Sequence, residues 1–418
     1  MKHLQHWAIF LSNKANKQLL VNQLLLNKFS EIFSGEEIKK GVLFSAITIK
    51  EMMEAEERHN TVEVAILANR QLRNLSGGEQ KKALLNFLLE TKPDFIIADN
   101  PFDNLDIDSQ SNLTLLLNDV AKNIQVIQLI NRTADHLPFI KNILSVNDKN
   151  IVCAYPEIRR YLQSINLDRN FLFLNDIPPA DEPLVSIMDP LIKYKDVTVK
   201  YEDRVIVKNI NWQINSGEFW HLTGPNGSGK TTLLSIITGD NVKGYGQDIT
   251  LFGKRKGSGE SVWDIKQNIG YFTASIIDLF SRYTTVEQMV ISGFYDSVGL
   301  YTIPSRRQIR LADNWLILIN MLPLKKVLFH TLSLGQQRMI VIVRAMVKHP
   351  PLLILDEPAV GLDDENVQIL VSLINKISAE STMAILYVSH RAEEGLCPGF
   401  TFTLTAGENG STGEAEQK

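Results

Sequence analysis

A glycine-rich loop at residues 224–232 has the composition and spacing needed to bind phosphate. It is a complete G-x-x-x-x-G-K-[ST] motif, made of Gly224, Pro225, Asn226, Gly227, Ser228, Gly229, Lys230, Thr231 and Thr232. Glycines let backbone N–H groups turn toward phosphate oxygens, and the N-terminus of a following helix adds a positive dipole end. We expect Lys230 to reach the β- and γ-phosphates of a nucleotide and the Thr231 hydroxyl to bind Mg²⁺.

This motif needs a strand before it and a helix after it, and the flanking residues predict both. Residues 219–223 are largely apolar, as in a buried strand, and residues 233–238 have a helical pattern. A glycine-rich turn with a chance lysine is the alternative, but it leaves the further motifs below unexplained.

The composition bounds the class of protein. A chain of 418 residues suggests two or three domains, and 44% hydrophobic residues is enough for ordinary globular cores. The net charge of −4 gives no strong basic field of the kind that attracts nucleic acid. Apolar runs such as 315–324 are too short to span a bilayer, and residues 1–10 lack the apolar core of a signal peptide. With only Cys153 and Cys397, a disulfide scaffold is excluded, so we expect a soluble, cytoplasmic protein.

Two stretches of the chain repeat one pattern with matched spacing. Ser76 lies in Leu-Ser-Gly-Gly-Glu-Gln and precedes Asp99 by 23 residues. Ser333 lies in Leu-Ser-Leu-Gly-Gln-Gln and precedes Asp356 by the same 23 residues. In both copies an apolar strand ends at this aspartate, and a further aspartate follows 7 residues later. The matched distances indicate an internal duplication.

The duplication predicts an α/β protein with two domains in tandem. Residues 1–158 form the first and shorter domain, and residues 191–405 form the second and intact one. Residues 159–190 contain a run of prolines and acids that is typical of a linker. Residues 406–418 are mostly Gly, Ser, Thr and Glu, so we expect a disordered tail.

The combined motifs resemble those of the ATP-binding-cassette (ABC) ATPases. Besides the phosphate-binding loop, they include a Leu-Ser-x-Gly-Gln signature at 332–336, Asp-Glu-Pro at 356–358 and Ser-His at 389–390. The resemblance covers residues 191–405 and implies P-loop NTPase domains of the ABC type that bind ATP and Mg²⁺. It also implies that ATP is sandwiched between the P-loop of one domain and the signature of another.

The resemblance assigns roles to four further residues of the second domain. The Asp356 carboxylate would help to position Mg²⁺, often through water. Glu357 would orient or deprotonate the attacking water, which is worth roughly 10²–10⁴ in rate. His390 would contact the γ-phosphate, and Tyr201 would stack on adenine. Ordinary structural roles are the alternative for both His390 and Tyr201.

The chain resembles one branch of the family and departs from the usual pattern at two places. The tandem domains, residues 293–297 and residues 251–260 resemble the molybdate-transport/photorepair-type ATPases. Ala274 and Ser275 stand where a switch glutamine is usual, which puts the coupling of Mg²⁺ to the helical subdomain in doubt. Leu334 stands where the signature has glycine, and its side chain could crowd an approaching phosphate.

The first domain lacks the residues that chemistry needs. No G-x-x-x-x-G-K-[ST] motif occurs in residues 1–75, and Asn100 replaces the catalytic glutamate. Asn131-Arg132 stands where the second domain has Ser-His, and neither side chain takes up a proton as glutamate or histidine does. With residues 3–26 as its opening strands, the domain is expected to have lost an internal segment. We expect it neither to bind ATP at a site of its own nor to hydrolyse it there.

The first domain nevertheless has the better-preserved signature. Ser76, Gly77 and Gly78 could complete the γ-phosphate site of the second domain, as the resemblance implies. The opposite site would join a missing P-loop to the Leu334 signature and would be inactive. Two alternatives stay open: the Ser76 signature is only a helix N-cap in a decaying domain, or two second domains pair in a homodimer.

The function that these patterns predict is Mg²⁺-dependent ATP hydrolysis, most simply as the ATP-binding component of a transport system. A separate membrane subunit would then dock near residues 294–301, at the inner face of the membrane, although this stretch could equally be core. The alternatives are a translation-factor-like protein, against which the short, acidic linker argues, and a regulatory ATP sensor that hydrolyses slowly.

Overall fold

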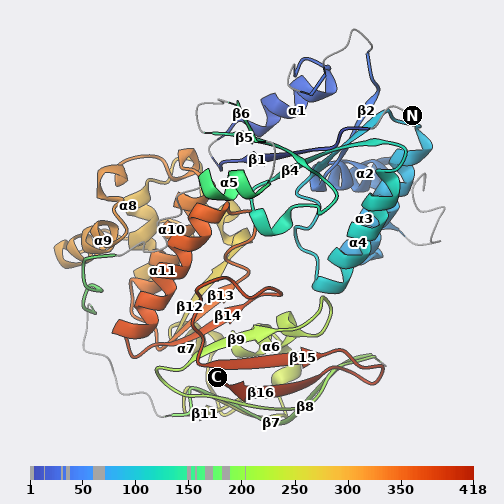
Figure 1. The fold of residues 1–418 in the computed structure, drawn as a ribbon. Coiled ribbons are helices and arrows are strands. Elements are labelled where there is room, and N and C mark those ends of the chain that lie inside the picture. The colour runs from blue at the N-terminus through green and yellow to red at the C-terminus, as the bar shows by residue number, and fades with distance from the viewer. Residues whose placement is uncertain are drawn as a thin grey trace. The chain divides into compact units, whose positions relative to one another are not determined.

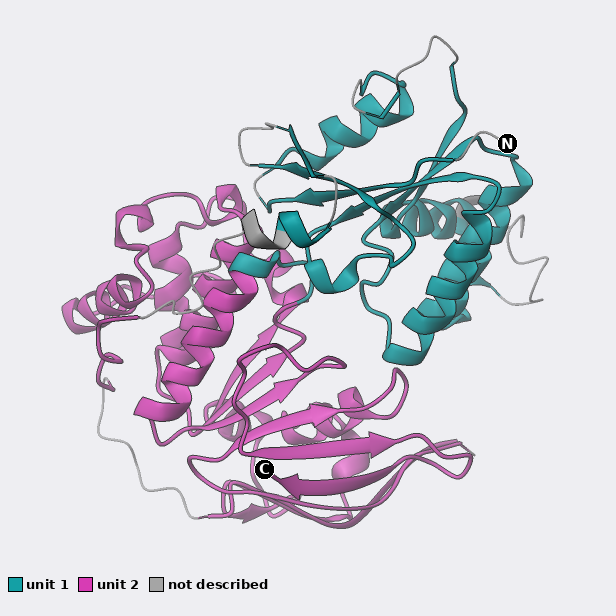
Figure 2. Cartoon of the chain, in the orientation of Figure 1, with its two compact units in different colours: residues 1–168, 360–365 teal, residues 169–359, 366–418 magenta. Residues whose placement is uncertain are grey.

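The computed structural model describes residues 4–13, 15–29, 32–33, 38–59, 71–147, 152–155, 158–164, 173–180, 189–202 and 204–418. The chain forms two compact units (Figure 2). Unit 1 comprises Met1–Asp168 and Val360–Glu365, and unit 2 comprises Arg169–Ala359 and Asn366–Lys418. Much of the predicted linker, residues 165–172 and 181–188, lies outside the described residues, while residues 159–164 belong to a helix.

Unit 1 is built on a six-stranded sheet with the order β2-β3-β4-β1-β5-β6 (Figure 1). All neighbours are parallel except β5 and β6. The strands are β1 Trp7–Leu11, β2 Gly41–Phe44, β3 Phe95–Asp99, β4 Gln125–Ile130, β5 Asn142–Val146 and β6 Val152–Tyr155. The helices are α1 Lys17–Leu25, α2 Ala46–His59, α3 Gly77–Glu90, α4 Ile107–Val120 and α5 Ile158–Ser164.

Both faces of this sheet are buried, as its nearly continuous apolar strands require. Alternate residues of each strand join different cores: Ile96 packs with Leu84 and Leu117 of α3 and α4, whereas Ile97 packs with Leu24 of α1. Unit 1 is therefore a three-layer α/β structure.

Unit 2 combines a second six-stranded sheet, ordered β12-β13-β14-β9-β15-β16, with a four-stranded antiparallel sheet, ordered β11-β10-β7-β8. The strands are β7 Ile192–Tyr201, β8 Arg204–Ile214, β9 Phe219–Thr223, β10 Asp248–Leu251, β11 Lys254–Arg255, β12 Ile269–Thr273, β13 Leu352–Asp356, β14 Ala384–Val388, β15 Phe400–Thr405 and β16 Thr412–Gln417. The helices are α6 Lys230–Ile237, α7 Val262–Lys266, α8 Val286–Ser292, α9 Arg306–Leu318, α10 Leu334–Met346 and α11 Asp364–Glu380. One apolar core joins the two sheets, with Trp212 of β8 stacked on Phe402 of β15.

The two large sheets match strand for strand, and the match corrects one expectation. β1 and β9 are each the fourth strand of their sheet and the first of it along the chain, so β1 is the counterpart of β9. The helix that follows each strand matches as well, so α1 is the counterpart of α6. The prediction that residues 3–26 form opening strands was therefore wrong, because Trp7–Leu11 is a central strand that leads straight into a helix. The described part of unit 1 has no counterpart of the antiparallel sheet of β7, β8, β10 and β11.

The prediction of a disordered tail at residues 406–418 was also wrong. Strand β16 pairs antiparallel with β15 from Thr405↔Thr412 to Phe400↔Gln417. Its polar composition misled the sequence analysis, because an edge strand is held by main-chain hydrogen bonds and is often lined with charged side chains. Gly413 is needed where it lies, since a Cβ there would come within 2.3 Å of the Phe402 ring.

Candidate functional site

The phosphate-binding loop of unit 2 lies between β9 and α6, as its motif predicts. Gly229 directly precedes α6 with a φ of 98°, in the left-handed region that favours glycine. A Cβ on Gly229 would lie 2.5 Å from Val207 Cγ1, and one on Gly224 would lie 2.6 Å from the Leu404 carbonyl oxygen. Both positions therefore require glycine, and the loop is packed tightly against β8 and β15.

Several polar groups of this site are placed to bind a phosphate. The Lys230 ammonium donates to the carbonyl oxygens of Gly224 (2.6 Å) and Pro225 (3.0 Å), within the loop itself. Ser228 Oγ and His390 Nε2 are buried without a hydrogen-bond partner. Buried polar atoms are rarely left so, and phosphate oxygens would satisfy both. The residues present thus fit a nucleotide phosphate.

Asp356 ends β13, the second strand from β9 across the sheet. Burial, together with the nearby Glu357 carboxylate, raises the pKa of Asp356 to about 6. Lys230 acts in the opposite direction on this pKa, which places its charge within reach of the carboxylate. A half-buried carboxylate facing a phosphate-binding loop is a suitable ligand for Mg²⁺.

Glu357 and His390 form a pair at the same edge of the sheet. His390 Nδ1 lies 3.2 Å from Glu357 Oε1, which leaves the unpartnered Nε2 free to meet a phosphate. Glu357 has a φ of 49°, unusual for a side chain of its kind, and its N–H donates to the Val388 carbonyl oxygen at 2.9 Å. Strain of this type, held by the surrounding strands, is common in active sites.

Tyr271 contacts the site although the sequence analysis did not select it. Its hydroxyl donates to Asp356 Oδ2 at 3.4 Å from the neighbouring strand β12. Thr273, at the end of β12, pairs in register with Asp356, and Ala274 and Ser275 follow at once. Side chains two residues apart in a strand point to the same face of the sheet. Tyr271 lies two residues before Thr273, so the position of the missing switch glutamine just after β12 could have led to it.

Tyr201 lies at the end of β7 with 43% of its surface exposed. Its hydroxyl accepts a hydrogen bond from Asn241 Nδ2 at 2.8 Å, and Lys243 Nζ lies 5.9 Å from the ring centroid. These contacts fix the ring at the surface, so adenine stacking stays a prediction.

Both signature serines cap helices. Ser76 begins α3 and Ser333 begins α10, each in a capping box, with Glu79 and Gln336 respectively. The helix-cap role that the sequence allowed for Ser76 is thus present, and an exposed cap remains compatible with a phosphate contact. Gly335, also in the second signature, requires glycine, because a Cβ there would overlap the side chain of Asn366.

The corresponding edge of unit 1 is closed by its own side chains. Lys17 is the first residue of α1, as Lys230 is of α6, and its ammonium forms an ion pair with Asp99 at 3.0 Å. Asp99 ends β3 as Asp356 ends β13. The sequence analysis missed Lys17 because residues 12–16 contain no glycine; the remaining signal was a lysine between an apolar strand and a helical pattern.

Three features lie on this sheet: a phosphate-binding loop, an acidic strand end and the Glu357–His390 pair. Together they define a P-loop nucleotide-binding protein of the ABC type. The chain belongs to the family of ABC ATP-binding proteins, whose profile, described as ABC transporter, matches residues 207–360. The prediction of tandem ABC-type α/β domains, with the first one shortened, is confirmed.

Three similar proteins illustrate the relationship. The chain is 38% identical to the ABC transporter ATP-binding protein ModF of Escherichia coli over 347 residues, which cover 79% of this chain and 69% of ModF. It is 32% identical to an uncharacterised ABC transporter ATP-binding protein of Schizosaccharomyces pombe over 351 residues, 81% of this chain and 69% of that protein. A chain from the solved structure of ribosome-bound archaeal Pelota and ABCE1 shares the fold, with a TM-score of 0.65 and 17% identity, over 99% of this chain and 75% of that one.

The raised pKa of Asp356 predicts that this residue destabilises the nucleotide-free protein. Since the carboxyl titrates near 3.8 ordinarily and near 6 when folded, the unfolding free energy falls as pH rises through this range. We expect Asp356→Asn to raise the unfolding free energy by on the order of 2 kcal/mol at pH 7.5, and the gain to vanish near pH 4. Urea unfolding at both pH values measures it, with the exposed Asp248→Asn as control. A variant less stable than wild type at pH 7.5 would contradict the assignment.

Proposed function

We propose that this protein binds and hydrolyses Mg-ATP at one site, and that it serves as the ATP-binding component of a transport system. The observation that carries the proposal is the group formed by the loop with Lys230, the half-buried Asp356 and the Glu357–His390 pair. These groups lie at the carboxyl ends of adjoining strands of one sheet.

Each residue of unit 2 has a role in this proposal. The loop N–H groups and the Lys230 ammonium bind and neutralise the phosphates. Thr231 and Asp356 would hold Mg²⁺, which would neutralise negative charge on the phosphates. Glu357 orients the attacking water and accepts its proton, since its second oxygen is free when the first contacts His390. The His390 Nε2 binds a γ-phosphate oxygen.

In this proposal unit 1 does not bind or hydrolyse ATP at a site of its own. The Lys17 charge is neutralised by Asp99, and the position of the catalytic carboxylate is taken by Asn100. The Asn100 amide donates to Asn131 Oδ1 at 3.0 Å. Asn131-Arg132 stands where unit 2 has Ser389-His390. In this proposal the γ-phosphate site of unit 2 is completed by Ser76, Gly77 and Gly78 of unit 1 when the two units close on each other.

A transport role is favoured by the names of the two relatives, both ABC transporter ATP-binding proteins. Among the described residues no helix has the length and apolar character needed to cross a membrane. In this proposal the chain works with a separate membrane subunit. The stretch expected to dock such a subunit, residues 294–301, is half-buried to exposed, with Tyr301 85% accessible. Ile303, two residues beyond it, is 97% accessible, whereas Trp315 is fully buried. The protein would then act in the cytoplasm, at the inner face of the membrane.

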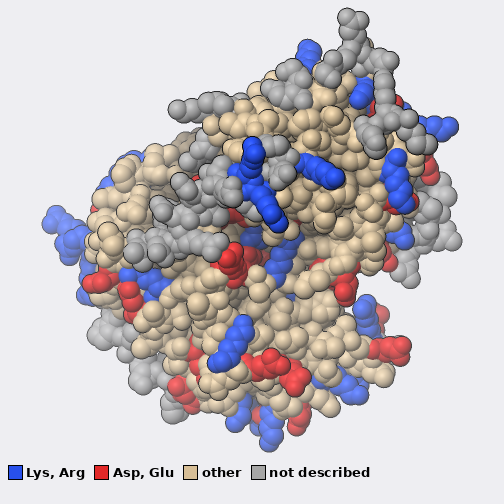
Figure 3. All heavy atoms as spheres, in the orientation of Figure 1, with Lys and Arg blue, Asp and Glu red and all other residues tan. Residues whose placement is uncertain are grey.

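The second candidate is a ribosome-associated function, suggested by the fold shared with the ribosome-bound structure. On the face drawn in Figure 3, basic and acidic side chains are interspersed. A regulatory ATP sensor remains the third candidate, because Ala274 and Ser275 replace the switch glutamine.

Glu357→Gln should leave ATP binding intact and lower turnover by about 10²–10⁴, because an amide cannot accept the proton from water. Lys230→Ala is the matched control, which should abolish binding itself. Calorimetric titration with ATP and steady-state phosphate release measure the two effects. Two ATP molecules bound per chain, or full activity of Glu357→Gln, would refute a single site of this design.

Ser76→Arg should abolish hydrolysis while leaving P-loop binding largely intact, because a long cationic side chain would block the face that approaches the γ-phosphate. Ser333→Arg should matter much less if its site holds no nucleotide. The steady-state ATPase rates of the two folded variants decide the architecture. The reverse pattern would indicate a homodimer of second domains, and equal losses would indicate that both serines act through helix capping.

The protein should co-purify with membranes from its own cells at physiological salt if it serves a membrane subunit. Sucrose-gradient fractionation, with and without ATP, separates this outcome from ribosome association. The variant Tyr301→Asp/Ile303→Asp, at two exposed positions, should release the protein from membranes without changing its ATPase rate. ATP-dependent sedimentation with ribosomes would overturn the transport role in favour of the second candidate.

A further inference from the structure

A buried histidine lies directly behind the phosphate-binding loop, outside the group of residues that would contact ATP. His221 is the central residue of β9, three residues before Gly224, and only 5% of its surface is exposed. Burying an imidazole costs free energy unless its nitrogens find hydrogen-bond partners. A specific polar contact is therefore expected for His221.

That contact is with Ser389, the residue immediately before His390. His221 Nε2 lies 3.0 Å from Ser389 Oγ, and both side chains are buried. Ser389 Oγ also donates to the Arg391 carbonyl oxygen. Since a hydroxyl has a single hydrogen, Ser389 accepts from His221, which then carries its proton on Nε2. The result is a directed chain of hydrogen bonds from β9 to the main chain beyond His390.

The neighbouring strands hold the imidazole in place. His221 pairs in register with Tyr387 of β14, and the two rings meet edge to face with centroids 5.8 Å apart. On its other side His221 pairs with Thr401 of β15. Burial lowers the pKa of His221 and the Lys418 charge acts in the same direction, whereas the Glu357 carboxylate acts against both. The imidazole is therefore uncharged at neutral pH, with one N–H to donate.

We propose that His221 is a positioning residue, which acts through Ser389 to hold His390 where it can meet the γ-phosphate. The inference rests on the proposed function of unit 2, because it concerns the same ATP site. Ser389 has two ties to β9: its N–H donates to the Leu222 carbonyl oxygen at 3.2 Å, and its hydroxyl accepts from His221. The first bond fixes the end of β14, and the second fixes the path of the chain through His390 to Arg391.

The loop that carries His390 lacks regular structure, so side-chain contacts determine its position. Residues 389–391 belong to neither a helix nor a strand. His390 Nδ1 lies 3.2 Å from Glu357 Oε1, and its Nε2 is buried without a hydrogen-bond partner. Misplacement of a reacting or stabilising group by about 1 Å can cost on the order of 10²-fold in rate. A bond that restrains this loop therefore has a direct effect on turnover.

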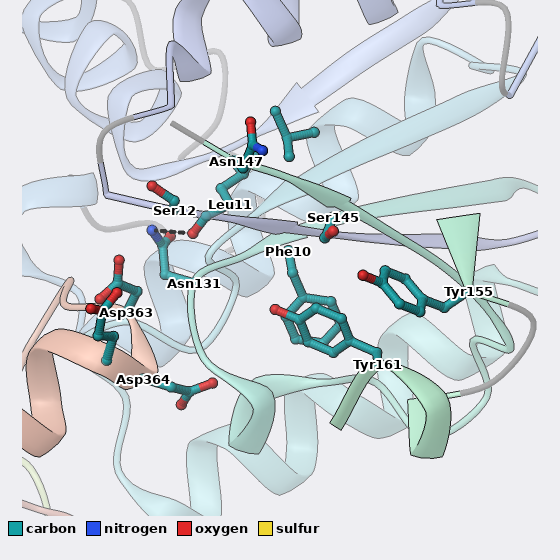
Figure 4. A pocket seen from close by; sticks show the side chains of 12 residues that line it. Phe10, Leu11, Ser12, Asn131, Ser145, Asn147, Tyr155, Tyr161, Asp363 and Asp364 are labelled. Carbon is teal, nitrogen blue, oxygen red and sulfur yellow. Dashed lines mark hydrogen bonds between the residues drawn. The ribbon is translucent and has the colours of Figure 1, made fainter. Parts of the chain in front are cut away.

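Unit 1 ties the corresponding strand ends with a different group. There Asn131, which follows β4, donates from Nδ2 to the Leu11 carbonyl oxygen of β1 at 3.2 Å (Figure 4). Strand β1 is the counterpart of β9 and contains no histidine. An amide bound to the main chain is enough to join two strand ends. The buried imidazole is found in the unit in which, in our proposal, a histidine has to be positioned.

Steady-state kinetics of variants at both ends of the bond test the positioning role. His221→Leu removes the donor, so kcat should fall about tenfold or more, while the KM for ATP and the calorimetric affinity for ADP change by less than about twofold. His221→Gln should restore most of kcat, because the glutamine Nε2 can donate from nearly the same place. Ser389→Ala should resemble His221→Leu, and the double variant should be no worse than either, because the two residues act as one unit.

The matched control is Thr401→Val, on the strand that flanks His221 on the other side. Thr401 Oγ1 is buried without a hydrogen-bond partner, so its loss should leave kcat unchanged. Additive losses in the double variant, or a His221→Gln variant as slow as His221→Leu, would overturn the inference. So would a loss of ADP affinity as large as the loss of kcat, because the P-loop itself would then be disturbed. If His221→Leu does not fold, Ser389→Ala and His221→Gln carry the test.

Histidine NMR tests the contact without nucleotide. In the full chain labelled at histidine, with His390→Gln used for assignment, His221→Leu should shift the ring signals of His390. His221→Gln should return them toward their wild-type positions. Unchanged His390 signals in His221→Leu overturn the inference at any turnover rate. If the wild-type chain shows no ATPase activity, the proposed function fails, and the His390 signals still decide whether His221 positions that ring.

Discussion

The carboxyl edge of a parallel sheet is the constraint on which both units depend. Parallel strands end side by side, so groups from distant parts of the sequence converge there, and backbone N–H groups are left facing outward. In unit 2 this edge brings Lys230, Asp356 and the Glu357–His390 pair into one electrostatic field. The cost is visible in Asp356, whose raised pKa records a carboxylate kept where burial disfavours its charge.

Unit 1 has the same sheet edge, but different side chains lie at it. Lys17 and Asp99 meet there and neutralise each other, and Asn100 and Asn131 stand where unit 2 has Glu357 and Ser389. The fold did not have to be rebuilt for this, because the strand order and the buried faces of the sheet are the same in both units. The large sheet is thus common to both units, whereas the antiparallel sheet and the glycine-rich loop of unit 2 have no counterpart in the described part of unit 1.

The sequence predicted the parts of this molecule that depend on local pattern and spacing. The P-loop, the acidic strand ends and the tandem α/β domains follow from motifs whose chemistry tolerates little variation. It failed where pairing decides structure: β1 was misplaced because five apolar residues do not reveal their neighbours, and β16 was missed because edge pairing needs no apolar side chains. Tyr271 escaped notice because its partner Asp356 lies on another strand, and Lys17 because residues 12–16 before it contain no glycine.

The left-handed backbone that follows the acidic strand end in each unit favours asparagine over glutamate at this position. Glu357 has a φ of 49° and Asn100 a φ of 41°, so the same turn is present in both units. Asparagine tolerates this conformation far better than glutamate, since its short side chain can bond locally. Asparagine at position 100 is therefore less strained than glutamate would be. Glutamate at position 100 would carry more backbone strain and would lose the hydrogen bond that the Asn100 amide donates to Asn131.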